Sequence, residues 1–249
     1  ELAEALGFKS AQIVSNIESG LRELKAHEAY SVSKILNVEF DRLLNTKDQP
    51  EPFVLWRELD PSAERVRLQE EAWFLLRCRR YAFIESMTRE EPIRGVPQFQ
   101  LDLDRWRFED VEDLATKVRG MFDLGATPAT QARSALEDQA GVKVFLADLK
   151  GGSGASTRGD FGDAILENRS EAPARRAFSL AHELFHLLTW DAVAHGVAQL
   201  PEKHRNRNET LANVFASALL MPQSEIKRRF GVPGSDGASW PRLLPIASA

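Results

Sequence analysis

The chain has 249 residues, of which 43% are hydrophobic and 28% are charged, with a formal net charge of −5. This composition is typical of a globular protein that buries an apolar core. The negative net charge excludes a polycation that binds nucleic acid over its whole surface, so any such binding must be local. No apolar run reaches the roughly 18 residues that a membrane span needs, and no membrane partner is expected.

Cys78 is the only cysteine. No intrachain disulfide can therefore form, which fits a reducing, cytoplasmic setting. Because Cys78 lies among large apolar residues, we expect an inert, half-buried thiol.

Residues 1–45 predict short helices separated by tight turns. Helices are expected at residues 2–6, 11–18 and 26–36, with a last turn at 40–44. Ser10 can cap the second helix and Gly20 can end it.

This segment resembles a helix-turn-helix domain of the Cro/C1 or Xre repressor type, with the first helix of the family's bundle missing. The resemblance lies in residues 2–7 (LAEALG), 14–20 (VSNIESG) and 35–38 (ILNV). It implies that residues 11–18 form the recognition helix, since in such domains that helix enters the major groove. By this match the DNA-facing side chains are Lys9, Ser10, Gln12, Ser15 and Asn16.

The charge of this segment leaves a second interpretation open. Residues 1–50 hold six Lys or Arg and eight Asp or Glu. A net negative segment is poorly suited to phosphate contact. A module retained for dimerisation or for docking a partner is therefore the alternative to DNA binding.

Prolines and polar residues at 46–61 predict a linker. After it, helical spacing of apolar residues predicts helices at residues 62–90, 108–122 and 128–140. The first of these has an apolar stripe, and Gly141 is expected to end the last one. The stripe consists of Val66, Leu68, Ala72, Leu75, Leu76 and Phe83.

Two strands are expected, at residues 142–146 and 161–168, because both runs are rich in apolar residues and are preceded by turn signals. The glycine-rich stretch 150–156 lacks the Gly-Lys-Ser/Thr sequence of a phosphate-binding loop. It is expected to be a flexible connection, with a loop that shapes a substrate cleft as the alternative. The tail at 231–249 is rich in Gly, Ser and Pro and is expected to be weakly structured or to wrap the surface.

A buried helix is expected at residues 170–189, with Ser170 as its cap and Pro173 in its first turn. It carries His182-Glu183-Leu184-Phe185-His186. Residues four apart share one helix face, so His182 and His186 can bind one metal ion. Two histidines and a glutamate are costly to bury unless they are paired or coordinated. This His-Glu-x-x-His pattern is a signature of zinc metalloproteases, in which the glutamate, here Glu183, is the general base.

A catalytic zinc ion takes three protein ligands and keeps a fourth position open. His195 and His204 are near in sequence, but their segment has no clear periodicity. Glu209 is the better candidate, because it stands at the start of an otherwise apolar helix expected at 208–221, where a carboxylate needs a cation. Asn213 follows one turn later on the same face and is expected to orient a ligand. The donor set accepts Zn²⁺, and Mn²⁺ or another divalent ion would also fit.

Residues 176–186 (RAFSLAHELFH) and 209–222 (ETLANVFASALLMP) together resemble the ImmA/IrrE family of metallopeptidases. The resemblance implies a gluzincin-like, cytoplasmic enzyme that cleaves a partner repressor and so relieves repression of stress-response or mobile-element genes. Some members carry an N-terminal Xre domain, and such modules often dimerise, so a homodimer is a further expectation. An oxyanion donor is expected as well, with Tyr30, Tyr81, His195 and His204 as candidates.

The sequence thus predicts a mainly helical α+β protein. It comprises an all-α helix-turn-helix domain at 1–45, a linker at 46–61, a zincin-like peptidase domain with a small β-sheet at 62–230, and a tail at 231–249. The predicted function is zinc-dependent, site-specific cleavage of a regulatory protein, coupled to a DNA-binding-type domain. The alternative is a DNA-binding regulator whose metal domain is a sensor or scaffold without proteolysis.

Overall fold

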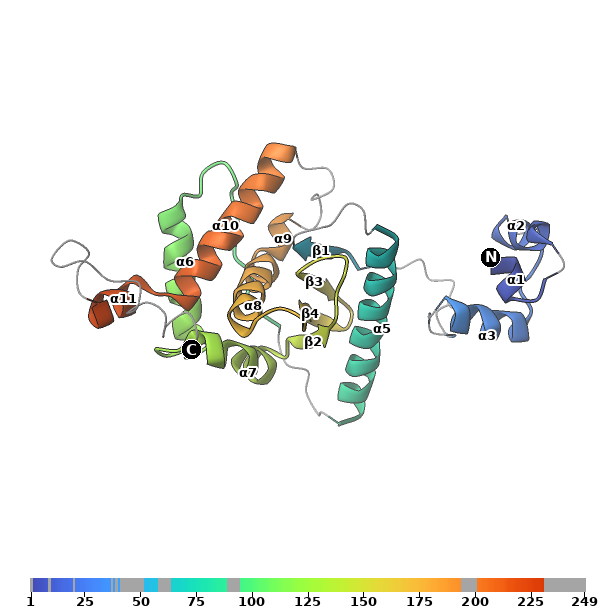
Figure 1. Ribbon diagram of the computed structural model, residues 1–249, viewed down its shortest axis with the longest axis horizontal. Helices are drawn as coiled ribbons and strands as arrows, with labels where there is room; N and C mark the ends of the chain where they lie inside the picture. The colour runs from blue at the N-terminus through green and yellow to red at the C-terminus, as the bar shows by residue number, and fades with distance from the viewer. Residues whose placement is uncertain are drawn as a thin grey trace.

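A computed structural model describes residues 2–8, 10–19, 21–36, 38, 40, 52–57, 64–88, 95–193 and 201–230. It is mainly helical with one four-stranded sheet, as predicted for an α+β protein (Figure 1). Within the described residues, no helix is long and apolar enough to cross a membrane. The tail predicted at 231–249 lies outside the described residues.

Among the described residues, three short helices lie in the N-terminal segment: α1 (Leu2–Ala5), α2 (Ala11–Glu18) and α3 (Ala26–Ile35). Helix α2 has the predicted bounds but buries none of its residues, whereas α3 buries Ala29 and Val32. Ser10 occupies the N-cap position of α2, as predicted, with extended backbone, but its side chain makes no capping hydrogen bond. Gly20 and residues 41–44 of the predicted last turn lie outside the described residues.

The sheet has the strand order β1-β3-β4-β2. Strand β3 is antiparallel to both β1 and β4, and β2 is parallel to β4. Strands β2 and β4 correspond to the two predicted strands. The bounds are β1 (Val54–Arg57), β2 (Lys143–Ala147), β3 (Gly154–Gly159) and β4 (Gly162–Asn168).

Strand β1 corrects the linker prediction, because it lies inside residues 46–61. Its residues alternate between partly buried and buried, and Leu55 and Arg57 are the buried ones. The indole of Trp56 donates a hydrogen bond to Glu71 on the neighbouring helix at 2.6 Å. Two prolines close to this strand in the sequence favoured the prediction of a linker. In the folded chain, tertiary contacts stabilise the strand.

The glycine-rich stretch 150–156 is not a flexible connection, since it leads into the buried strand β3. A Cβ atom on Gly152 would lie 2.8 Å from the Trp56 ring and 2.9 Å from the carbonyl oxygen of Arg57. Position 152 therefore requires glycine because its backbone lies so close to β1, and not because the segment has to be mobile.

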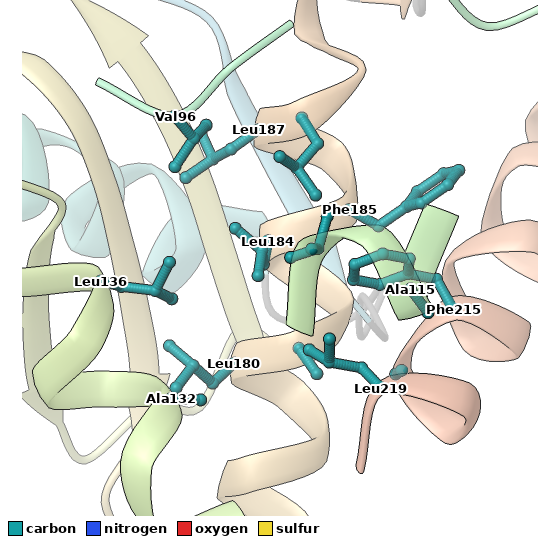
Figure 2. Close-up of a cluster of buried hydrophobic side chains, with 14 of the residues drawn as sticks. Val96, Ala115, Ala132, Leu136, Leu180, Leu184, Phe185, Leu187, Phe215 and Leu219 are labelled. Atoms are coloured by element: carbon teal, nitrogen blue, oxygen red, sulfur yellow. The ribbon is translucent and has the colours of Figure 1, made fainter. Parts of the chain in front are cut away.

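Helices cover both faces of the sheet (Figure 1). Alternate strand residues face opposite sides, so Ala155 and Leu166 pack with Phe74 of α5, while Leu55 and Ile165 join the core around α8. Figure 2 shows Leu180, Leu184 and Phe185 at the centre of that second core, among side chains of α6, α7 and α10. The helices are α5 (Glu64–Thr88), α6 (Phe108–Met121), α7 (Pro128–Ala140), α8 (Pro173–Leu188), α9 (Trp190–Val193), α10 (Glu202–Leu220) and α11 (Gln223–Phe230).

Several helix details differ from the prediction. In α5 the buried residues include Phe74 and Cys78, while Leu68 and Phe83 of the predicted stripe are exposed. The N-cap of α8 is Ala172, because the Ser170 hydroxyl donates to Asp148 instead, at 3.0 Å. The predictions for α7 hold at both ends, and Gly141 adopts the left-handed conformation (φ 64°) that ends this helix.

Cys78 is completely buried rather than half-buried. Burial raises the pKa of its thiol, which keeps the sulfur protonated and poorly nucleophilic. The expectation of an inert thiol is consistent with this position.

If β1 belongs to the core, Leu55→Ala should lower the free energy of unfolding by about 2–5 kcal/mol, as other large-to-small core substitutions do. Leu68→Ala, at a side chain that is 54% exposed on α5, is the matched control and should change it by less than about 0.5 kcal/mol. Urea denaturation followed by circular dichroism measures both. Equal, small effects would contradict the position of β1.

Candidate metal centre

Helix α8 carries His182 and His186 one turn apart, and α10, which packs along α8, carries Glu209. All ten residues from Ser179 to Leu188 are buried. Neighbouring elements therefore surround this part of α8, and the packing of the core restricts its polar side chains. Helix α10 begins at Glu202, two turns earlier than predicted, so Glu209 lies within the helix and not in its first turn.

The three side chains converge on one point. His182 Nε2 lies 3.1 Å from His186 Nε2 and 3.1 Å from Glu209 Oε2, and His186 Nε2 lies 3.4 Å from Glu209 Oε1. Bonds of about 2.0–2.1 Å to zinc place tetrahedral ligand atoms about 3.3 Å apart. The observed separations are close to this value, with each histidine nearest to a different oxygen of Glu209.

The donor chemistry also fits a cation. The two imidazoles are 1% and 3% exposed, so little water reaches the two facing nitrogens. Two nitrogen lone pairs at 3.1 Å repel each other unless a proton or a metal ion lies between them. The Glu209 side chain is 43% exposed, which leaves the point of convergence open to solvent on one side. Among the described residues, His182, His186 and Glu209 form the one cluster whose donor atoms could share an ion.

Asn213 contacts Nδ1 of His182, the ring nitrogen that faces away from the other donor atoms. Its Oδ1 lies 3.0 Å from His182 Nδ1 and can only accept, so Nδ1 must carry the proton. Nε2 then keeps its lone pair and faces the other donor atoms. The sequence predicted that Asn213 orients a ligand, and the contact with His182 is compatible with that role.

Asn208 contacts Nδ1 of His186 in a similar way, and the sequence did not predict this contact. Its amide lies against His186 Nδ1, with Nδ2 at 3.4 Å, while its Oδ1 is buried without a hydrogen-bond partner. A half-turn of the amide would let Oδ1 accept the proton of Nδ1 and satisfy both groups. The available signal was its place directly before Glu209, in an otherwise apolar helix.

Glu183 follows His182 on α8, about 100° further around the helix, and points toward the sheet. It is completely buried, and its Oε2 accepts a hydrogen bond of 2.7 Å from the Ser156 hydroxyl, while its Oε1 has no partner. Burial raises the pKa of Glu183 to about 7; the nearby His182 and the Ser156 hydrogen bond oppose this shift. A carboxylate in this range exchanges a proton readily near neutral pH.

Glu209 is shifted in the opposite direction. Burial by itself would raise its pKa, but contacts with both imidazoles hold the pKa of Glu209 well below its usual range. The two carboxylates thus differ, with Glu209 kept ionised, as a ligand must be, and Glu183 able to take a proton.

Other predicted residues lie elsewhere. His204 is paired with Asp104 at 3.1 Å, Tyr81 on α5 packs against Phe145, and Tyr30 on α3 packs against Phe40. His195 lies outside the described residues.

The predicted DNA-facing residues lie on or next to α2. Ser10, Gln12 and Ser15 are exposed, and Gln12 Nε2 donates to Asn16 Oδ1 at 3.1 Å, which orients both side chains. Lys9 lies outside the described residues.

Comparison with known families agrees with both resemblances. Residues 137–243 match the model of the peptidase M78 family, described as an IrrE N-terminal-like domain, and residues 1–43 match a helix-turn-helix model. The chain is therefore similar to a helix-turn-helix domain over residues 1–43 and to an IrrE-like domain over residues 137–243. These matches cover α1–α3 and the elements from the end of α7 onward, including the whole candidate metal centre.

A solved structure described as a Mycobacterium tuberculosis transcriptional regulator is similar to part of the chain. The identity is 22% and the TM-score 0.37, over 48% of this chain and 38% of that protein. The chain thus spans well under two thirds of the length of that regulator. No curated protein matches the chain.

If Asn208 and Asn213 orient the histidines, Asn208→Ala and Asn213→Ala should each weaken zinc binding about 10- to 100-fold, because each ring loses the partner that fixes its donor nitrogen. Asn206→Ala, at an exposed position on the same helix, is the control and should bind zinc normally. Competition with a chromogenic chelator measures the affinity. Unchanged affinity in both variants would contradict these roles.

Proposed function

We propose that this chain is a zinc-dependent endopeptidase that cleaves a regulatory protein such as a transcriptional repressor. One observation carries the proposal: His182, His186 and Glu209 bring donor atoms within 4.8 Å of one another, beside a buried glutamate whose pKa is raised to about 7. The match to an IrrE-like peptidase domain supports it.

The ligands in this proposal are His182, His186 and Glu209, with Asn208 and Asn213 orienting the two rings. A zinc ion held there supplies a Lewis acid that polarises a peptide carbonyl and makes a bound water more acidic. Manganese or another divalent ion would suit the same donors.

Glu183 is the proposed general base. Its unpartnered Oε1 takes a proton from the attacking water, and the same carboxyl then delivers it to the amine that leaves. The raised pKa suits both steps near neutral pH, since neither form of the carboxyl is strongly disfavoured.

The helix-turn-helix domain supports a regulatory substrate over an arbitrary peptide. A peptidase joined to such a domain would act where regulators bind DNA, and the cytoplasm is its proposed location. The exposed polar side chains Gln12 and Ser15 on α2 are the proposed base-contacting groups, together with Ser10 and Asn16, and Lys9 is proposed from the sequence alone. A homodimer would present two such helices to one operator.

Glu183→Gln should keep normal zinc content and abolish cleavage, because the amide cannot take the proton from water. His182→Ala should lose both the metal and the cleavage. Glu202→Gln, at an exposed position on α10, is the control. Elemental analysis gives the zinc content, and cleavage is assayed against repressors encoded beside the gene and against a quenched fluorescent peptide library. Cleavage that survives in Glu183→Gln would reject this mechanism.

The second candidate is a DNA-binding regulator whose metal domain senses or stabilises without proteolysis. The helix-turn-helix match over residues 1–43 favours it, and it requires no cleavage by the zinc-loaded protein.

For DNA binding, Gln12→Ala and Ser15→Ala should each weaken binding to an operator by about 1–3 kcal/mol per lost base contact. Ser31→Ala, exposed on α3, is the control. Fluorescence anisotropy with the DNA upstream of the gene, at several salt concentrations, measures the affinity. Operator binding without cleavage would favour the second candidate, whereas no preference for any DNA would favour a dimerisation or docking role for residues 1–45.

A further inference from the structure

Strand β3 places a polar side chain on the face of the sheet that packs against α8. Residues along a strand alternate between faces. Ala155 belongs to the cluster on the α5 side, whereas Ser156 faces α8 and contacts Glu183. Around it the α8-facing side carries apolar residues, among them Leu55 on β1 and Ile165 on β4, which are the register partners of Ser156. A buried hydroxyl here needs a partner, and Glu183 is that partner.

The contact is short and protected from water. The Ser156 hydroxyl donates to Glu183 Oε2 at 2.7 Å, and both residues are 0% exposed. A hydrogen bond between a neutral hydroxyl and a carboxylate is among the stronger kinds, particularly where water cannot compete. Ser156 is also fixed in place, because its strand is hydrogen-bonded on both edges.

The two oxygens of Glu183 therefore differ. Oε2 is held by Ser156, whereas Oε1 is buried and has no partner. Gly154, the next residue on the same face of β3, keeps side-chain atoms away from Oε1, since even a Cβ atom there would approach it to 3.6 Å. A buried acceptor without a hydrogen-bond partner is unfavourable, so we expect a donor to bind Oε1 during function.

We infer that Ser156 is a positioning residue, which holds Oε2 of Glu183 so that Oε1 alone is presented to the attacking water. This inference rests on the proposed function of Glu183 as general base. It predicts a loss in the chemical step rather than in folding, zinc binding or substrate binding, because Ser156 contacts none of the three proposed ligands in the described structure.

The test compares Ser156→Ala with Thr157→Val. Thr157 is the next residue of β3, is also 0% exposed, and donates its hydroxyl to the Phe53 carbonyl at 2.7 Å on the opposite face. Each substitution removes one buried hydroxyl from the same strand with little change of volume. Both variants are measured for zinc affinity, urea midpoint, and kcat and KM on the peptide that the wild type cleaves in the library.

Ser156→Ala should lower kcat about 10- to 100-fold, as loss of a supporting hydrogen bond does, with KM and zinc affinity unchanged. Thr157→Val should leave kcat unchanged, and Ser156→Thr, which keeps the hydroxyl, should recover part of the lost kcat. Wild-type kcat in Ser156→Ala, an equal loss in Thr157→Val, or a loss of zinc affinity in Ser156→Ala would each overturn the inference.

A second readout does not depend on cleavage. In a double-mutant cycle, the effects of Ser156→Ala and Glu183→Ala on the urea midpoint should be non-additive, because each substitution removes the hydrogen bond between them, whereas those of Thr157→Val and Glu183→Ala should add. Additive effects for the first pair would also reject the inference.

A wild type that cleaves no substrate would reject the proposed function and, with it, the positioning role. Cleavage by the wild type together with a fully active Ser156→Ala would reject the inference alone.

Discussion

The structure depends on the unfavourable burial of three polar side chains, His182, Glu183 and His186. Helix α8 carries two histidines and a glutamate into a core in which every residue from Ser179 to Leu188 is shielded from solvent. Polar groups in such a position cost several kcal/mol unless each of them finds a partner (about 2–7 kcal/mol for an unpaired neutral group). The fold must therefore bring complementary groups to α8 from elsewhere in the chain.

Two neighbours supply these groups, one on each side of the helix. Helix α10 brings Asn208, Glu209 and Asn213 to the histidines, and strand β3 brings Ser156 to Glu183. The ligand side and the base side are therefore served by separate elements. Because α8 is buried from both directions, the ligands and the base are fixed relative to each other by the packing of the core.

Local signals made part of this architecture predictable. Pro128 and Gly141 mark the ends of α7, because proline suits the first turn of a helix and glycine its left-handed end. The four-residue spacing of His182 and His186 specified a shared face, and a carboxylate in an apolar helix singled out Glu209.

Other elements could not be predicted from local sequence. Strand β1 lies in a proline-containing stretch and is stabilised by β3 and by the contact of Trp56 with Glu71. The glycines before β3 indicated flexibility, but Gly152 is needed because the strands approach so closely. Ser156 carries no signal of its own, and the only signal for Asn208 was its place before Glu209, since a serine or an asparagine has a role here only through the residue that it contacts.

The sequence by itself determined the helix that carries the histidines, their shared face, the third carboxylate and the two kinds of domain. Those features depend on spacing along one chain segment, which periodicity reveals. The tertiary structure alone decided which groups meet: Glu209 with the two histidines, the asparagines with the outer ring nitrogens, and the serine with Glu183. These contacts join residues 22 to 31 positions apart, and only the packing of α8 against α10 and β3 brings them within hydrogen-bond distance.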